Sequence, residues 1–161
     1  MAVISQEEMA VRAEDLRRQG QVVVFTNGCF DLLHRGHIEL LERARGEGDR
    51  LFVGVNGDDS VRRLKGEGRP FQSAADRAAI VDALAAVDDV AIFHDDTPEE
   101  LIRKVKPQVL VKGGDYEGER IVGAALVKSW GGKVVTVPLV PGRGTSLVLQ
   151  KILSSLQRKN G

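Results

Sequence analysis

The sequence predicts an α/β protein with a Rossmann-like, doubly wound sheet of five parallel strands in a single domain. Short, unbroken apolar runs of the kind that form buried strands recur along the chain, and each is followed by a segment with helical periodicity. Strands that alternate with helices pair in parallel, because each helix returns the chain to the same end of the sheet. The chain has 161 residues, of which 42% are hydrophobic, and this suits one domain with one core.

The first expected element is a helix near the N-terminus. Ser5 is suited to its N-cap, and the helical pattern continues to Gln19 before a glycine ends it. We therefore expect a domain that spans residues 1–161, with an N-terminal helix within residues 1–20 and an α/β core in residues 21–157.

The next segment joins a strand to a helix and carries two histidines. Residues 22–25 form an unbroken apolar run, a turn follows, and apolar residues then recur at helical spacing over residues 38–44. His34 and His37 lie where the turn gives way to this helix. A helix N-terminus attracts anions through its free N–H groups and partial positive charge, and two imidazoles add donors at the same point. The junction is therefore predicted to bind phosphate.

Two plainer interpretations of these histidines must be weighed. A single histidine at a helix start is more often a cap or a surface residue. A His-x-x-His pair can also bind metal, but the chain offers only His94 and Cys29 as further histidine or cysteine ligands. The pair, placed directly after a strand and beside glycines, favours phosphate.

The rest of the chain continues the alternation. Residues 65–70 form a glycine-rich, charged loop, and similar turns separate the other elements. Further strands are expected at residues 51–55, 90–93, 109–111 and 134–137. Further helices are expected at residues 58–64, 73–85, 97–106 and 121–130, and from a cap at Thr145 or Ser146 to residue 156.

Composition limits the partners and the compartment. Lysine plus arginine equals aspartate plus glutamate at 23 each, so the chain lacks the net positive charge that supports binding to nucleic acid or anionic membranes. No apolar run approaches the length of a bilayer span, and the N-terminus lacks a signal-peptide layout. The single cysteine fits a reducing compartment. We expect a cytoplasmic protein that binds neither nucleic acid nor membrane.

Three polar, glycine-rich stretches follow expected strands: residues 26–31 (TNGCFD), 112–116 (KGGDY) and 141–146 (PGRGTS). The carboxyl ends of parallel strands meet at one edge of a sheet, and ligands bind there where the strand order reverses. We therefore expect the three stretches to form one site. Simple turns would account for any one of them, but they account poorly for the lysine, aspartate and hydroxyl groups within them.

These motifs resemble the signature of the HxGH nucleotidyltransferase superfamily, which includes the cytidylyltransferases and pantetheine-phosphate adenylyltransferase. Neighbouring motifs narrow the resemblance to the ADP-heptose synthase adenylyltransferase domains, over residues 21–153. The larger form of that family is fused to a sugar kinase, and a chain of 161 residues corresponds to the stand-alone form. The motifs are residues 26–31, His34-Arg35-Gly36-His37, residues 56–66 (NGDDSVRRLKG) with Arg69-Pro70, residues 95–98, and residues 110–116 (LVKGGDY).

The resemblance implies an enzyme, a nucleotidyltransferase that moves AMP from ATP to D-glycero-D-manno-heptose 1-phosphate, in its β anomer. Its products would be pyrophosphate and ADP-heptose, which is used to build the lipopolysaccharide core. A sugar phosphate is already an anionic nucleophile, so the enzyme needs no general base and must instead align the reactants and neutralise charge. Mg²⁺ is the implied cofactor, held mainly by phosphates and water, because no carboxylate cluster marks a dedicated metal site.

The resemblance also assigns roles to residues at the matching positions, in three groups. The catalytic residues would be His34, His37 and Lys65. The nucleotide-binding residues would be Phe25, Thr26, Asn27, Gly28, Phe30, Gly36, Gly114, Asp115, Thr145 and Ser146. The residues that contact the sugar phosphate would be Asp31, Arg77, Lys112, Gly113 and Tyr116. For Arg77, pairing with a carboxylate is the open alternative, and for Asp31 it is orienting the turn or a histidine.

The sequence departs from the superfamily pattern in one region and leaves rival functions open. The second signature usually reads Ser-Thr-Thr, whereas this chain has Gly144-Thr145-Ser146, and Leu139 stands where cytidylyltransferases have an arginine. Arg143 could replace that arginine in space. The alternatives are a cytidylyltransferase of the glycerol-3-phosphate type and a non-catalytic nucleotide sensor. A dinucleotide-binding redox protein is disfavoured, because no G-x-G-x-x-G follows the first strand. The resemblance further implies a homodimer.

Overall fold

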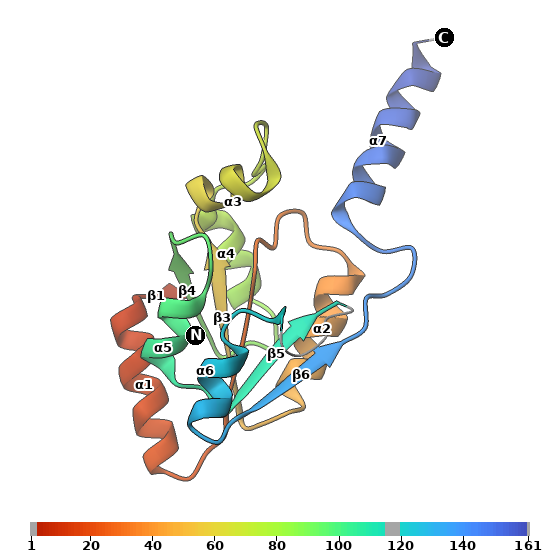
Figure 1. The fold of residues 1–161 in the computed structure, drawn as a ribbon. Coiled ribbons are helices and arrows are strands. Elements are labelled where there is room, and N and C mark those ends of the chain that lie inside the picture. The colour runs from red at the N-terminus through yellow and green to blue at the C-terminus, as the bar shows by residue number, and fades with distance from the viewer. Residues whose placement is uncertain (1–2, 115–119, 161) are drawn as a thin grey trace.

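The computed structural model describes residues 3–114 and 120–160, and six parallel strands form one sheet within them (Figure 1). The strands run in the order β1-β4-β3-β2-β5-β6. They are β1 (Val3–Ile4), β2 (Val23–Gly28), β3 (Arg50–Asn56), β4 (Asp89–Phe93), β5 (Val109–Gly113) and β6 (Lys133–Val137). The helices are α1 (Gln6–Arg18), α2 (Arg35–Arg45), α3 (Asp58–Lys65), α4 (Ala74–Asp82), α5 (Glu99–Val105), α6 (Ala124–Ser129) and α7 (Thr145–Lys159).

The Rossmann-like parallel sheet is confirmed, but the prediction of five strands is wrong. The sixth strand is β1, which pairs with the edge of β4 through Val3–Val90 and Ile4–Ala91. Periodicity identifies a strand only over about 4–8 residues, so a two-residue strand leaves no such signal. The five predicted strands are β2 to β6, and the strand order reverses between β2 and β5.

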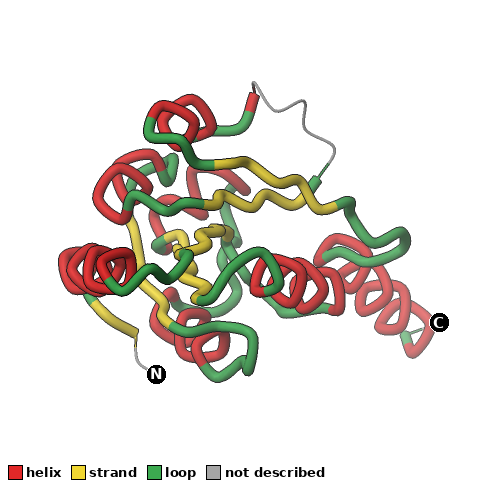
Figure 2. Tube along the Cα trace, turned by 90° about the horizontal axis from the view of Figure 1, so that it is seen from below, coloured by secondary structure: helices red, strands yellow, loops and turns green. Residues whose placement is uncertain are grey.

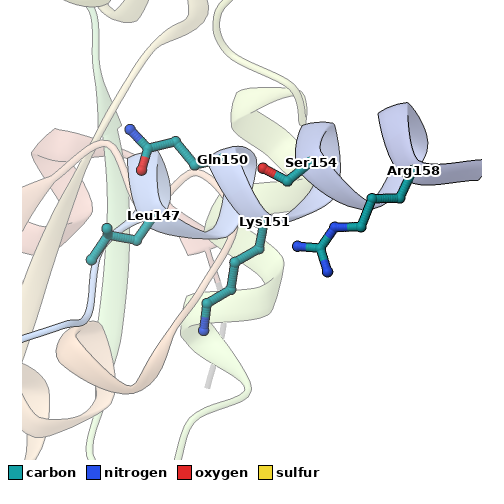
Figure 3. Close-up of a pocket in the computed structure, with 5 residues that line it drawn as sticks. All are labelled: Leu147, Gln150, Lys151, Ser154 and Arg158. Carbon is teal, nitrogen blue, oxygen red and sulfur yellow. The ribbon is translucent and has the colours of Figure 1, made fainter. Parts of the chain in front are cut away.

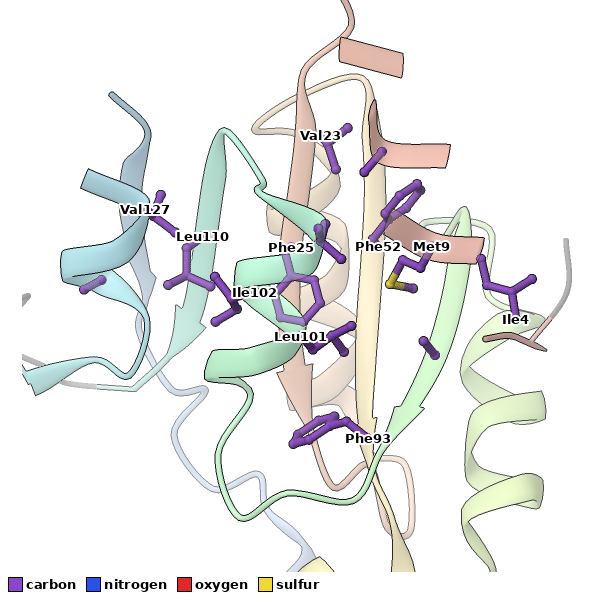
Figure 4. Packing of buried hydrophobic residues seen from close by; sticks show 14 of the residues in the cluster. Ile4, Met9, Val23, Phe25, Phe52, Phe93, Leu101, Ile102, Leu110 and Val127 are labelled. Carbon is purple, nitrogen blue, oxygen red and sulfur yellow. The ribbon is translucent and has the colours of Figure 1, made fainter. Parts of the chain in front are cut away.

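Helices cover both faces of the sheet, and each face buries its own apolar cluster (Figure 2). On one face, α1, α5 and α6 pack over a cluster that includes Phe25, Phe52, Phe93 and Met9 (Figure 4). On the other face, α2 and α4 pack over the valine-rich side of β2, β3 and β4. The near-continuous apolar strands predicted from the sequence are therefore buried on both sides, as parallel strands with helical crossovers require.

Several helix boundaries follow from local chemistry. Ser5 caps α1 as predicted, because its side chain accepts a hydrogen bond from the Glu8 N–H. The helix expected at residues 97–106 begins later, with Pro98 at its N-cap position and Glu99 as its first residue. The helix expected at residues 121–130 is shorter, since left-handed Gly123 precedes α6.

The last helix, α7, projects away from the sheet and carries the C-terminus outward (Figure 1). None of its residues is buried. No helix in the described ranges is both long and apolar enough to cross a bilayer.

Candidate active site

The turn between β2 and α2 has an unusual backbone that sets the position of both histidines. Phe30 and Leu32 adopt left-handed conformations, with φ of 50° and 57°. Such conformations cost a non-glycine residue about 1–2 kcal/mol each, so the surrounding structure must hold them in place. The Phe30 side chain is buried and lies beside His37, with ring centroids 5.4 Å apart.

The two histidines cap the helix that they begin. His34 occupies the N-cap, and its Nδ1 accepts a hydrogen bond from the Gly36 N–H at 3.1 Å. The Nδ1 of His37 accepts from the backbone N–H of His34 at 3.3 Å, which completes a capping box. The imidazole rings stack with centroids 3.8 Å apart. Glycine is required between them, because a Cβ at Gly36 would lie 2.9 Å from the His34 ring.

This capping arrangement fixes which ring nitrogen carries the proton. A nitrogen that accepts a hydrogen bond is not protonated, so each neutral imidazole holds its hydrogen on Nε2. Burial, the neighbouring His34 and the charge of Lys65 lower the pKa of His37 to about 4. Burial also lowers the pKa of His34. Both rings are therefore neutral at pH 7, and each has an Nε2–H group that the cap does not use.

Asp31 connects the histidine turn to two other parts of the chain. Its buried carboxylate accepts hydrogen bonds from Arg69 Nε at 3.0 Å, from Phe71 N–H at 2.9 Å and from Gln72 N–H at 3.2 Å. Its backbone carbonyl accepts from the Thr145 hydroxyl at 3.1 Å. Asp31 thus holds the loop after α3 and the start of α7 against the turn. This agrees with the alternative that Asp31 orients the turn. Its direct contact with the sugar stays a prediction.

The residues at the ends of β2 and β5 meet at the strand-order reversal. Lys112 Nζ donates to the side-chain oxygen of Asn27 at 3.2 Å, and burial lowers the pKa of this lysine. The Thr26 hydroxyl donates to the Val111 carbonyl at 2.8 Å, inside the sheet. Because Lys112 and Asn27 are only partly buried, both side chains can exchange this contact for one to a ligand.

Lys65 and the start of α7 approach the same turn. Lys65 ends α3 and is exposed, yet its charge acts on both His37 and Cys29. The prediction that Thr145 or Ser146 caps α7 is wrong. Gly144 occupies the N-cap position without a side-chain bond, since the Thr145 hydroxyl is directed to Asp31. A Cβ at Gly36 would lie 3.7 Å from the Arg143 Cβ, so Arg143 is next to the histidine turn.

Arg77 is fully buried, and the structure supports the pairing alternative for it. Its guanidinium donates to the carbonyls of Cys29, Asn56 and Gln72 and forms an ion pair with Asp58 at 2.7 Å. These partners lie at or just after the ends of β2 and β3, at the start of α3 and in the loop before α4. Arg77 therefore holds the strand ends of the site in place, and its guanidinium is already occupied by protein acceptors.

The remaining predicted residues fall into two sets. Gly28, Gly113 and Gly114 lie at or beside the carboxyl ends of β2 and β5, where the site forms, whereas Phe25 lies in the middle of β2 with its side chain in the core. Asp115 and Tyr116 lie outside the described residues. Arg69, which anchors Asp31, received no role from the sequence, although it stands in a matched motif. Across the described ranges, no three histidine, cysteine, aspartate or glutamate side chains gather as a metal site.

Comparisons with known proteins find relatives over most of the chain. The cytidylyltransferase-like family matches residues 25–145. The bifunctional protein HldE of Pseudomonas paraeruginosa is 52% identical over 150 residues, which cover 93% of this chain but 32% of that protein. The chain thus spans about a third of the length of such relatives.

Solved structures show the same fold. A lipopolysaccharide core biosynthesis protein from Thermoplasma volcanium is 30% identical and superposes with a TM-score of 0.60. The match covers 75% of this chain and 98% of that protein. Pantoate-beta-alanine ligase from Francisella tularensis is 19% identical, with a TM-score of 0.63 over 90% of this chain and 69% of its own. The second likeness bears on the fold alone.

The Asp31 contacts predict the effect of Asp31→Asn. An amide in place of the carboxylate leaves at least one of the three donors without an acceptor, so we expect a loss of about 2–3 kcal/mol in unfolding free energy. Amide hydrogen exchange at Phe71 and Gln72 should become faster. Asp59→Asn is the control, because Asp59 is exposed and its ion pair among the described residues is with Arg62. Unchanged exchange with a raised KM for the sugar phosphate would contradict the anchoring role and favour a direct contact.

The lowered pKa of His37 predicts a pH-dependent loss of stability. In the unfolded chain His37 binds a proton near pH 6.5, whereas in the folded chain it does so only near pH 4. The contribution of neutral His37 to the unfolding free energy is therefore fully present above pH 6.5, and it is lost as the pH falls from 6.5 toward 4. We expect His37 to account for about 1–2 kcal/mol of this loss, less than the full shift because the ring is partly solvated. Urea unfolding of wild type and His37→Asn at several pH values measures it. Parallel curves for the two proteins would exclude His37 as the source.

Proposed function

Because the chain belongs to the cytidylyltransferase-like family, we propose that it transfers the adenylyl group of ATP to D-glycero-D-manno-heptose 1-phosphate, as the β anomer, and releases pyrophosphate. ADP-heptose for the lipopolysaccharide core would be the product. The observation that carries this proposal is the paired histidine cap, which uses both Nδ1 atoms and leaves two neutral Nε2–H donors beside the N-terminus of α2. The relatives named HldE and the lipopolysaccharide core protein of Thermoplasma support the choice of sugar substrate.

In this proposal the chain aligns the reactants and neutralises charge. The sugar phosphate supplies its own anionic oxygen to attack the α-phosphorus, so no side chain has to remove a proton. The Nε2–H groups of His34 and His37 donate to phosphate oxygens where negative charge grows. Lys65 closes over the triphosphate from the end of α3, and the N-terminus of α7 at Thr145 and Ser146 binds the outer phosphates.

The nucleotide and sugar would bind at the strand-order reversal. The backbone from Phe25 to Gly28, together with Phe30, Gly36 and Gly114, lines the nucleotide side. Lys112 and Gly113 face the sugar phosphate at the end of β5. Mg²⁺, held mainly by phosphate oxygens and water, would share the charge of the transferring group. The side chains of His34, His37 and Lys65 offer N–H donors, which suit phosphate oxygens, so the oxygen ligands of the ion would come from the phosphates and water.

We further propose that the protein acts in the cytoplasm and as a homodimer. A cytidylyltransferase of the glycerol-3-phosphate type remains the second candidate, because the family model matches the domain and not the base of the nucleotide. A nucleotide sensor is disfavoured, since binding alone does not need both imidazole donors.

The proposed reaction is tested by pyrophosphate release. Each of the four ribonucleoside triphosphates is combined with β- and α-heptose 1-phosphate and with glycerol 3-phosphate, in the presence of Mg²⁺. We expect turnover only with ATP and the β-heptose phosphate. Turnover with CTP and glycerol 3-phosphate would show instead that the protein is a cytidylyltransferase of the glycerol-3-phosphate type. Binding of ATP without any pyrophosphate release would favour the sensor.

The role of the imidazole donors is tested by His34→Asn. Asparagine is a good N-cap, and its side-chain oxygen can replace Nδ1, so the unfolding free energy should change by less than about 0.5 kcal/mol. The Nε2–H donor is lost, so kcat should fall by about 10²–10³. His94→Asn is the matched control, because His94 lies outside the turn. Equal activity of the His34 variant and wild type would remove His34 from the mechanism.

A further inference from the structure

Arg69 is a partly buried arginine that has no role in the proposed reaction. It belongs to the loop between α3 and α4, and its side chain is 18% exposed. Its Nε donates to the Asp31 carboxylate at 3.0 Å. The guanidinium also lies over the ring of Phe71, with Cζ 4.8 Å from the ring centroid. The carboxylate and the aromatic ring together hold the plane of the guanidinium in one orientation.

Most of the donors of this guanidinium are not used by the protein. An arginine side chain has five N–H donors. In the described part of the chain, the side-chain hydrogen bonds of Arg69 consist of the one from Nε to Asp31. Buried polar side-chain atoms without a partner are limited, among the same residues, to Asp82 Oδ1. The Nη1 and Nη2 atoms of Arg69 are therefore open to solvent.

Arg77 is the contrast within the same region. Its guanidinium is fully buried, and its donors are directed to three carbonyls and to Asp58. Such an arginine serves the fold. Arg69 instead offers a planar pair of Nη donors that is held in place but not occupied by the described residues. This arrangement suits a phosphate group, whose oxygens accept two parallel N–H bonds from one guanidinium.

The open donors lie at the turn that carries the histidines. Asp31 is part of this turn, and its carbonyl accepts from the hydroxyl of Thr145 at the start of α7. Burial raises the pKa of the Cys29 thiol, and the charges of Lys65 and Arg69 are among those that oppose this shift. Both cations are therefore close to the turn. The end of α3, the loop that follows it and the start of α7 all meet there.

The cations of α7 itself lie farther away. Figure 3 shows Lys151 and Arg158 along this helix, with Gln150 and Ser154. At a rise of 1.5 Å per residue, Lys151 is about 9 Å and Arg158 about 20 Å beyond Thr145, on a helix that projects away from the sheet. The cations at the turn come from α3 and the loops, rather than from the body of α7.

We propose that Arg69 binds the outer phosphates of the nucleoside triphosphate through its two Nη atoms and so holds the pyrophosphate as it leaves. This inference rests on the proposed function, in which Lys65 and the start of α7 receive the same phosphates. When the bond between the α-phosphorus and the bridging oxygen breaks, its electron pair passes to the pyrophosphate. A guanidinium that is already oriented stabilises this charge without reorganisation. Asp31 then positions Arg69 as well as the turn.

The simpler interpretation is that Arg69 only neutralises the buried carboxylate of Asp31. A lysine at this position keeps the charge and can donate to Asp31, but it lacks the planar pair of donors. If neutralisation is the whole role, Arg69→Lys should bind phosphates as wild type does. If the Nη atoms bind phosphate, the variant should remain folded and lose affinity.

The experiment measures the binding of pyrophosphate, ATP and AMP by isothermal titration calorimetry, in the presence of Mg²⁺. Arg69→Lys should bind pyrophosphate and ATP about 10–100-fold more weakly than wild type. AMP lacks the outer phosphates, so its affinity should not change. Arg62→Lys is the matched control, because Arg62 is in the same region and pairs with exposed Asp59. Equal affinity of Arg69→Lys and wild type for pyrophosphate would overturn the inference.

AMP binding also shows whether the variant is folded. If Arg69→Lys does not fold, Arg69→Gln replaces it with the same expectations, because the amide N–H of glutamine can donate to Asp31 in place of Nε.

Two further outcomes separate this inference from the proposed function. A raised KM for the sugar phosphate, with unchanged affinity for pyrophosphate, would assign Arg69 to the other substrate and overturn the inference alone. Weaker pyrophosphate binding by Arg69→Lys, in a protein that uses CTP instead of ATP, would support the inference and change only the proposed function. If wild type binds none of the three ligands, both are overturned.

Discussion

The carboxylate of Asp31 is the contact on which the arrangement of the site depends. Burying a charge is costly unless donors surround it, and here Arg69 and two backbone N–H groups do so. The same residue lies between Phe30 and Leu32, whose left-handed conformations need support from outside the turn. One buried carboxylate thus stabilises a strained turn and fixes the loop that follows Lys65. The histidines keep their positions because this turn cannot relax.

The capping box gives the two histidines a structural and a chemical role that do not compete. Each Nδ1 is occupied by a backbone N–H, so the capping role fixes the tautomer and the ring orientation. Each Nε2–H is then left for a ligand. Burial and mutual proximity keep both imidazole rings neutral. Each Nε2–H can therefore donate a hydrogen bond to a ligand although the ring carries no additional proton. A histidine in the sequence shows that such a group is available, but only the cap shows which nitrogen is offered.

The sequence was most informative where one short segment determines its own structure. The buried strands, the Ser5 cap and the histidine-bearing junction all follow from local patterns, and the structure has them where predicted. It was least informative where contacts between distant segments decide. Nothing near Arg77 in the sequence reveals that its partners are Cys29 and Asn56. The Thr145 hydroxyl likewise serves a carbonyl that is 114 residues away instead of its own helix.

The exposed helices show how a sequence can contain a requirement that one copy of the chain leaves unmet. Hydrophobic burial acts on any apolar surface, whether the partner atoms come from the same chain or another one. In this structure α7 and the outer side of α4 both keep apolar residues in water. Since α7 begins at Thr145, whose hydroxyl donates to the Asp31 carbonyl in the histidine turn, any surface that covered the apolar side of α7 would also influence how firmly the proposed phosphate site is ordered.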